Sequence, residues 1–89
     1  IINGDIFATV TEFQADNTLT LTDGSDVDGN IDSLVATQGK LVLAGDHLID
    51  GTIGATKALN TVTVVGAGKT VDFTGDITAG SLNFGLLAN

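Results

Sequence analysis

Short apolar patches with an alternation of two residues recur along the chain, separated by turns that are rich in glycine and aspartate. Every second side chain is apolar in the patches Leu19–Leu21, Leu41–Leu43 and Val71–Phe73, so one side of an extended strand is apolar in each. Further apolar patches are Val10–Phe13, Leu34–Ala36, Leu59–Val64 and Leu82–Phe84. The turns between them contain glycine, which tolerates the positive φ of tight corners. The pattern predicts short β-strands joined by corners.

A Gly-x-Ile element adds a second, longer period. Its glycines stand at positions 4, 29, 51 and 75, which are 25, 22 and 24 residues apart. This spacing is the size of one coil of a β-solenoid. An in-register stack places one isoleucine above another at about 4.8 Å per coil, and the isoleucines concerned are Ile6, Ile31, Ile53 and Ile77.

We therefore predict one all-β domain over residues 1–89, a single-stranded parallel β-helix (β-solenoid). It has three to four coils of about 22–25 residues, with approximate boundaries 4–28, 29–50, 51–74 and a partial coil 75–89. The alternative is a small antiparallel β-sandwich, whose strands are also short and separated by Asp-Gly and Ala-Gly turns. The regular phase of the isoleucines favours the solenoid.

The charge and aromatic content exclude several classes of partner. The net charge is −8, with 11 acidic residues against three lysines and no arginine, and the chain has no tyrosine or tryptophan. Such a surface repels phosphate backbones and lacks stacking platforms for bases or sugar rings. We therefore expect no nucleic acid partner, and no direct membrane insertion of this segment because no apolar run approaches the length of a membrane span.

The chain has no cysteine and begins at Ile1 without an initiator methionine. A secreted domain of this size that stands alone often needs disulfides. We therefore interpret the chain as a processed product or an excised segment. Its expected partners are a second copy of itself or neighbouring coils of a larger parent chain.

Residues 39–85 carry a distinctive style of repeat. The segments that carry it are GKLVLAGD (39–46), DGTIGATKALNTVTV (50–64), VDFTGDI (71–77) and LNF (82–84). They resemble the passenger repeats of rickettsial-type outer-membrane autotransporters, the surface cell antigens and surface-layer proteins. The resemblance implies a large protein secreted through its own C-terminal β-barrel, with a passenger that coats the cell as an adhesin or surface layer. The resemblance identifies no binding residue in this chain.

The densest polar cluster lies within residues 23–32, where oxygen-bearing side chains alternate at Asp26, Asp28, Asn30 and Asp32. Carboxylate and amide oxygens are the ligands that Ca²⁺ takes, so these four residues are a candidate calcium site. An EF-hand register fails, because it places Gly24 and Val35 where acids are required. The other interpretation is a solvated corner with Asx-type turns. A calcium site predicts that a chelator lowers the melting temperature.

Other candidate groups have simpler structural explanations. The aspartates that follow glycine, Asp5, Asp46 and Asp76, recur with the turns, whereas carboxylate-pair hydrolysis needs two carboxyls facing one groove. We expect these carboxylates to bond nearby backbone N–H groups. His47, the only histidine, is expected at the surface. We therefore predict that the protein is not an enzyme and that calcium is its one candidate cofactor.

Two further features are expected to be structural. The four phenylalanines are Phe7, Phe13, Phe73 and Phe84. We assign them to the core rather than to an exposed aromatic patch, because three of them fall on the inward alternation. The stretch Gly66–Thr70 has the composition of a phosphate loop. It lacks the first glycine at the required spacing, so it is interpreted as a turn.

Together these observations predict a structural or adhesive, non-catalytic segment of an extracellular bacterial surface protein, similar to an autotransporter passenger. A host or matrix protein is a further expected partner. The alternative is a self-assembling β subunit that forms filaments or a surface layer by end-to-end strand pairing, because the open ends of a solenoid present unpaired strand edges.

Overall fold

The computed structural model of the protein describes residues 4–66 and 70–84, and all of its regular structure is β. The strands are β1 (Ile6–Phe13), β2 (Thr18–Leu21), β3 (Val27–Ser33), β4 (Lys40–Ala44), β5 (His47–Asp50), β6 (Leu59–Val65), β7 (Val71–Phe73) and β8 (Ala79–Phe84). Within these described ranges no helix has the length and hydropathy needed to cross a bilayer.

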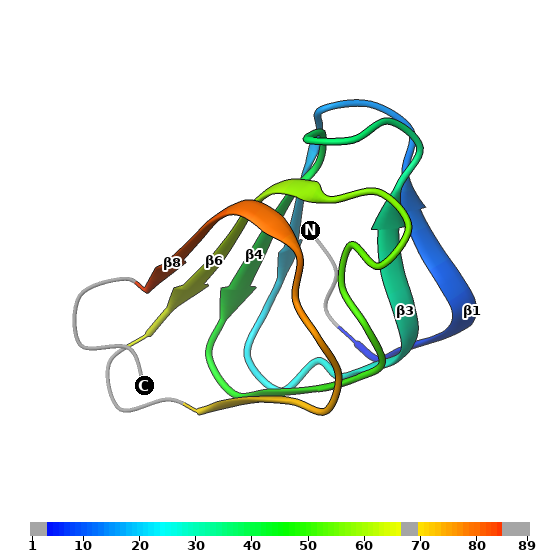
Figure 1. The fold of residues 1–89 in the computed structure, drawn as a ribbon. Coiled ribbons are helices and arrows are strands. Elements are labelled where there is room, and N and C mark those ends of the chain that lie inside the picture. Colours follow the sequence, from blue (N-terminus) through cyan, green and yellow to red (C-terminus); the bar gives the residue numbers. More distant parts are fainter. Residues whose placement is uncertain (1–3, 67–69, 85–89) are drawn as a thin grey trace.

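The strands form two four-stranded sheets, in the orders β1-β3-β5-β7 and β2-β4-β6-β8, and every neighbouring pair is parallel. A strand therefore pairs with the strand two places further along the chain, after the chain has passed through the other sheet (Figure 1). This winding is a β-solenoid of about four coils, as the sequence predicted. We call β1 with β2 coil 1, β3 with β4 coil 2, β5 with β6 coil 3, and β7 with β8 coil 4.

Columns of apolar side chains fill the space between the two sheets. One column is Leu19, Leu41, Val62 and Leu82, and the next is Leu21, Leu43, Val64 and Phe84. The members of coils 2 and 3 are almost completely buried, whereas Leu82 and Phe84 of coil 4 are 44% and 58% exposed. The hydrophobic core thus lies mainly in coils 1 to 3, and its columns end at an exposed surface at coil 4.

The predicted isoleucine column is correct for three coils and wrong for the first. Ile31, Ile53 and Ile77 stack in parallel register, but Ile6 pairs with Val27. The register of β1 against β3 shifts between Phe7 and Val10, so the first Gly-x-Ile element is out of phase with the others. The predicted boundary between the first two coils, at residues 28 and 29, was derived from the assumption that all four elements are in phase.

The predicted strands are correct at most of the apolar patches and wrong at one. Residues 34–36 form a bend and turn in which Leu34 and Val35 are exposed. The Gly29–Ile31 element, which the sequence predicted to stack in register, lies within β3, but sequence analysis missed β5, where the polar His47 takes an inward position. The inward residues of β5 are His47 and Ile49, while Leu48 faces outward.

Candidate functional site

Aspartate side chains join each coil to the next. The Asp5 carboxylate accepts a hydrogen bond from the Asp26 N–H, and the Asp26 carboxylate accepts one from the Leu48 N–H, each at 2.9 Å. A second series of the same kind, at 2.7 and 2.8 Å, runs through Asp23, Asp46 and Thr70. In both series the carboxylate belongs to one coil and the N–H group to the following coil. We call these contacts inter-coil bonds. They satisfy backbone donors near the corners, outside the strand ladders.

The expected role of the aspartates after glycine is confirmed for Asp5 and Asp46, with one difference. Their carboxylates bond backbone N–H groups, but the donors are 21 and 24 residues away in sequence rather than nearby. The side chain of Asp76 is exposed and accepts no hydrogen bond from the residues that the structure describes. The repetition of these aspartates therefore follows the repetition of the coils.

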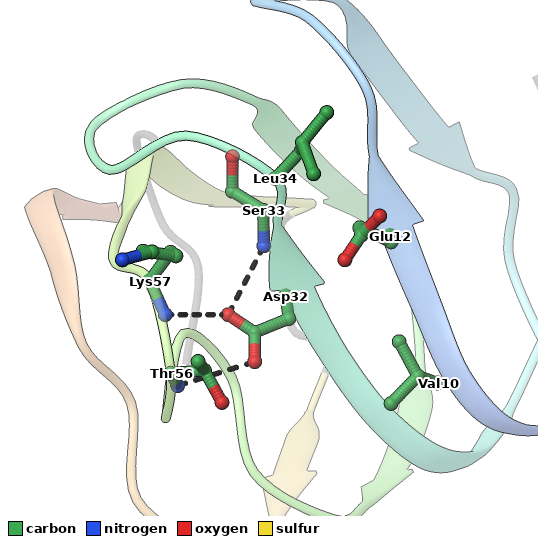
Figure 2. Close-up of a pocket in the computed structure, with 7 residues that line it drawn as sticks. All are labelled: Val10, Glu12, Asp32, Ser33, Leu34, Thr56 and Lys57. Atoms are coloured by element: carbon green, nitrogen blue, oxygen red, sulfur yellow. Dashed lines mark hydrogen bonds between the residues drawn. The ribbon is translucent and has the colours of Figure 1, made fainter.

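Asp32 makes the most extensive inter-coil contact in the candidate cluster. It lies near the end of β3, and its carboxylate points toward the loop after β5 (Figure 2). It accepts hydrogen bonds from the N–H groups of Lys57 at 2.8 Å, Ser33 at 3.0 Å and Thr56 at 3.1 Å. Burial raises the pKa of Asp32, but the hydrogen bonds from Lys57, Ser33 and Thr56 outweigh it and hold the pKa below its ordinary value.

Replacing Asp32 with asparagine is expected to lower the free energy of unfolding at pH 7 by about 2 kcal/mol, because charge-assisted hydrogen bonds are lost. The folded pKa is depressed, so the contribution is complete above the unfolded value of about 3.9 and is lost as pH falls through the lower, folded value. Urea titrations at pH 7, 5 and 3 measure this. The difference in the free energy of unfolding between wild type and variant is expected to narrow below about pH 4. A difference in this free energy that stays constant down to pH 3 contradicts the assigned role of the Asp32 carboxylate.

The hollow beside Asp32 has a volume of about 320 Å³ and is also lined by Val10, Glu12 and Leu34 (Figure 2). The Glu12 carboxylate, on the neighbouring strand β1, accepts a hydrogen bond from the Gln14 side-chain amide at 2.6 Å. Both carboxylates that line the hollow are therefore engaged in hydrogen bonds within the protein. The absence of catalysis stays a prediction.

The four calcium candidates take separate roles. Asp26 and Asp32 bond the N–H groups described above, and the Asn30 side-chain oxygen accepts a hydrogen bond from the Thr52 N–H at 2.9 Å. Asp28 is exposed on β3. In residues 4–66 and 70–84 no group of three or more histidine, cysteine, aspartate or glutamate side chains has an arrangement suited to a metal ion. Calcium binding by this cluster remains a prediction that the chelator experiment tests.

Asp16 connects three coils at the corner between β1 and β2. Its carboxylate lies 3.0 Å from the Lys40 ammonium and accepts hydrogen bonds from the Asn60 side-chain amide at 3.2 Å and the Gly39 N–H at 3.0 Å. The hydrogen bond from Lys40, followed by those from Asn60 and Gly39, holds the pKa of Asp16 below its ordinary value. This acid, like Asp5, Asp26, Asp32 and Asp46, holds neighbouring coils together.

The expectation that His47 lies at the surface is wrong. His47 is only 5% exposed, because it occupies an inward position of β5. Its Nε2 lies 2.8 Å from the carbonyl oxygen of Ala44, and its Nδ1 contacts the carbonyl oxygen of Ser25 in the preceding coil. Both ring nitrogens therefore face backbone carbonyl groups. The imidazole bridges two segments of the core.

The phenylalanines divide between core and surface. Phe13 is buried and Phe73 packs against the core, as predicted. Phe7 is 76% exposed, and Phe84 continues an inward column but is exposed at the end of the solenoid. In the Gly66–Thr70 stretch, residues 67–69 lie outside the described residues.

The structural role of Asp23 escaped the sequence analysis. A signal for it was present, because Asp5 and Asp26 are 21 residues apart and Asp23 and Asp46 are 23 apart, each about one coil. A spacing of about one coil therefore applied to side chains that bond backbone groups as well as to the isoleucines. Aspartates separated by about one coil length recur in both series of inter-coil bonds.

Comparisons with known proteins give no relative. No family model, no curated protein and no solved structure matches the chain.

Proposed function

We propose that this chain is a structural and adhesive, non-catalytic segment of an extracellular bacterial surface protein, of the kind found in autotransporter passengers. The observation that carries the proposal is the use of the acidic side chains. Asp5, Asp16, Asp26, Asp32 and Asp46 bond the neighbouring coil instead of converging on a substrate groove. Such bonds, repeated along a stack, tie each coil to its neighbours.

The outer face of the β1-β3-β5-β7 sheet supplies the contact surface. Asp28 and Asp72 are exposed there and accept no hydrogen bonds from the described part of the chain, and Leu48 between them is 42% exposed. Acidic side chains beside apolar ones suit a basic patch on a host or matrix protein. The resemblance of residues 39–85 to autotransporter passenger repeats supports the same location, at the bacterial cell surface.

The adhesive role is tested with beads that carry the purified chain, whose retention on extracellular matrix is measured under flow. We expect retention above that of uncoated beads, and at least a threefold loss for the double variant Asp28→Lys and Asp72→Lys, because it reverses two charges on one face. Thr18→Lys is the matched control, since it places a lysine on the exposed outer face of the other sheet. Equal retention of coated and uncoated beads contradicts the adhesive role.

A second function, a self-assembling subunit, is favoured by the exposed ends of the core columns. Leu82 and Phe84 belong to inward columns, yet about half of each residue's surface is exposed to solvent. Stacking of a further coil removes that apolar surface from water. Size-exclusion chromatography with light scattering, over rising protein concentration, is expected to show masses that increase by whole subunits. A constant monomer mass contradicts this second function.

A further inference from the structure

One inward column is incompletely buried at both ends of the solenoid. At the coil 4 end, Leu82 ends the column whose interior members, Leu41 and Val62, are fully buried. At the coil 1 end, Leu19 begins that column and is only partly buried. A further coil placed on either end therefore meets an apolar position of the same register. The two ends therefore match in register along this column, whereas Leu21, which begins the neighbouring column, is already fully buried at the coil 1 end.

The inter-coil bonds give the stack a direction. Asp5 and Asp16 of coil 1 accept hydrogen bonds from N–H groups of coil 2. Asp26, Asn30 and Asp32 of coil 2 accept them from coil 3. In these carboxylate and amide bonds the acceptor side chain lies in the earlier coil and the N–H donor in the later one. The hydroxyls of Ser25 and Thr74 accept in the opposite direction, from the N–H groups of Gly4 and Gly51. The two ends consequently differ in where they present carboxylates, although one apolar column matches in register.

The coil 4 end carries carboxylates in these positions without a donor. Asp72 pairs with Leu48, and Leu48 donates its N–H to Asp26, which places Asp72 in the column that starts at Asp5. Among the residues that the structure describes, nothing donates a hydrogen bond to the side chain of Asp72 or Asp76. At the opposite end, the N–H of Asp5 occupies the position that a preceding carboxylate would bond.

From this arrangement we propose that copies of the chain join head to tail. Strands β7 and β8 of one copy pair in parallel with β1 and β2 of the next, and Asp72 accepts a hydrogen bond from the Asp5 N–H of the arriving copy. The proposal rests on the self-assembling function proposed above and specifies its joint. Contact between two coil 4 ends instead brings Asp72 and Asp76 against their own copies, without donors and with like charges together.

Charge controls how readily this joint forms. Each copy carries a net charge of −8, so two copies repel each other. Inside the chain, however, Asp5 and Asp26 already stand in successive coils, joined by the same kind of hydrogen bond. Raising the salt from 0.1 to 1 M shortens the screening length from about 10 Å to about 3 Å. Assembly is therefore expected to increase with sodium chloride concentration.

The polarity is tested with two variants that each block one end. Leu19→Glu places a charge on the apolar surface of coil 1, and Leu82→Glu does the same at coil 4. A head-to-tail joint needs one intact end of each kind, so each variant alone stays a monomer and filaments are lost. The matched controls are Thr20→Glu and Asn83→Glu, which add the same charge in the neighbouring column of partly or fully exposed residues.

Light scattering in 1 M sodium chloride separates the arrangements. Head-to-tail joining predicts that each blocked variant alone is monomeric, that their 1:1 mixture forms dimers and nothing larger, and that both controls assemble like wild type. A dimer of Leu19→Glu alone, or of Leu82→Glu alone, overturns the head-to-tail polarity while self-assembly stands. A wild-type chain that stays monomeric overturns self-assembly itself.

Two additions guard the test against misfolding and address the bond itself. Circular dichroism confirms that each variant is folded, and Thr20→Pro replaces Leu19→Glu if that variant is not. Lys40 donates its N–H to the Asn17 carbonyl, so in a parallel ladder the Thr20 N–H points away from coil 2. Thr20→Pro therefore blocks pairing at the free edge of coil 1 without removing a bond to coil 2.

The hydrogen bond assigned to Asp72 is tested by a separate variant. Asp72→Leu, which imitates Leu48 of the same column, is expected to weaken the joint roughly tenfold. Unchanged assembly of Asp72→Leu overturns the assigned bond.

Discussion

Replacing Gly29 with alanine is expected to prevent stable folding, or to lower the free energy of unfolding by at least about 3 kcal/mol. The φ angle of Gly29 is +127°, and a Cβ atom built there overlaps the carbonyl oxygen of Ala8 in the preceding coil. The obstacle is backbone rather than a flexible side chain. The coils must separate to make room, which breaks the ladder between β1 and β3. Thermal unfolding followed by circular dichroism measures the loss.

Gly24→Ala is the matched control for Gly29→Ala. Gly24 also has a positive φ, +84°, but a Cβ atom there meets nothing within 4 Å. This variant therefore carries only the conformational penalty of a left-handed residue, about 1 kcal/mol. A melting temperature for Gly29→Ala equal to that of Gly24→Ala contradicts the close stacking of coils 1 and 2.

Replacing Leu43 with alanine is expected to lower the free energy of unfolding by about 3–5 kcal/mol. Leu43 is fully buried between Leu21 and Val64 in one interior column. A solenoid coil is held by the coils above and below it, so a cavity in coil 2 weakens the contacts to both neighbours. Since small domains have a total stability of about 5–15 kcal/mol, this single change removes much of it. Urea unfolding at neutral pH measures the effect.

The control is the same substitution on the other side of the sheets. Leu48 is 42% exposed on the outer face of β5, so Leu48→Ala is expected to change the free energy of unfolding by less than about 1 kcal/mol. Similar losses for Leu43→Ala and Leu48→Ala contradict the assignment of the core to the space between the two sheets.

Local alternation allowed some of the strands to be predicted. Leu19 and Leu21, and Leu41 and Leu43, alternate with polar or outward residues and lie in the core columns. The same reasoning failed for Leu34–Ala36, because those residues are apolar but stand where the chain turns between β3 and β4. It also failed for β5, where the polar His47 takes an inward position and the apolar Leu48 faces outward.

The candidate calcium site could also be predicted only in part from the sequence. Oxygen-bearing residues alternate over 26–32, and that spacing alone agrees with a cation site or with a solvated corner. The structure instead directs Asp26 and Asp32 to N–H groups that are 22 and 25 residues further along the chain. Which donor a carboxylate meets depends on the coil stacked against it. No local pattern contains that information.

The sequence by itself determined that the chain is all-β, that it repeats as stacked coils, and that Ile31, Ile53 and Ile77 share one column. These properties follow from side-chain alternation and from a spacing of about one coil, both of which are visible along the chain. The predicted period of 22–25 residues is slightly longer than the 20–24 residues that separate paired positions. Only the tertiary structure decided the register of coil 1, the burial of His47 and the donors of the aspartates. Each of these depends on which residue of the next coil lies opposite, and one extra residue at the Phe7–Val10 irregularity changes that pairing for all residues before it.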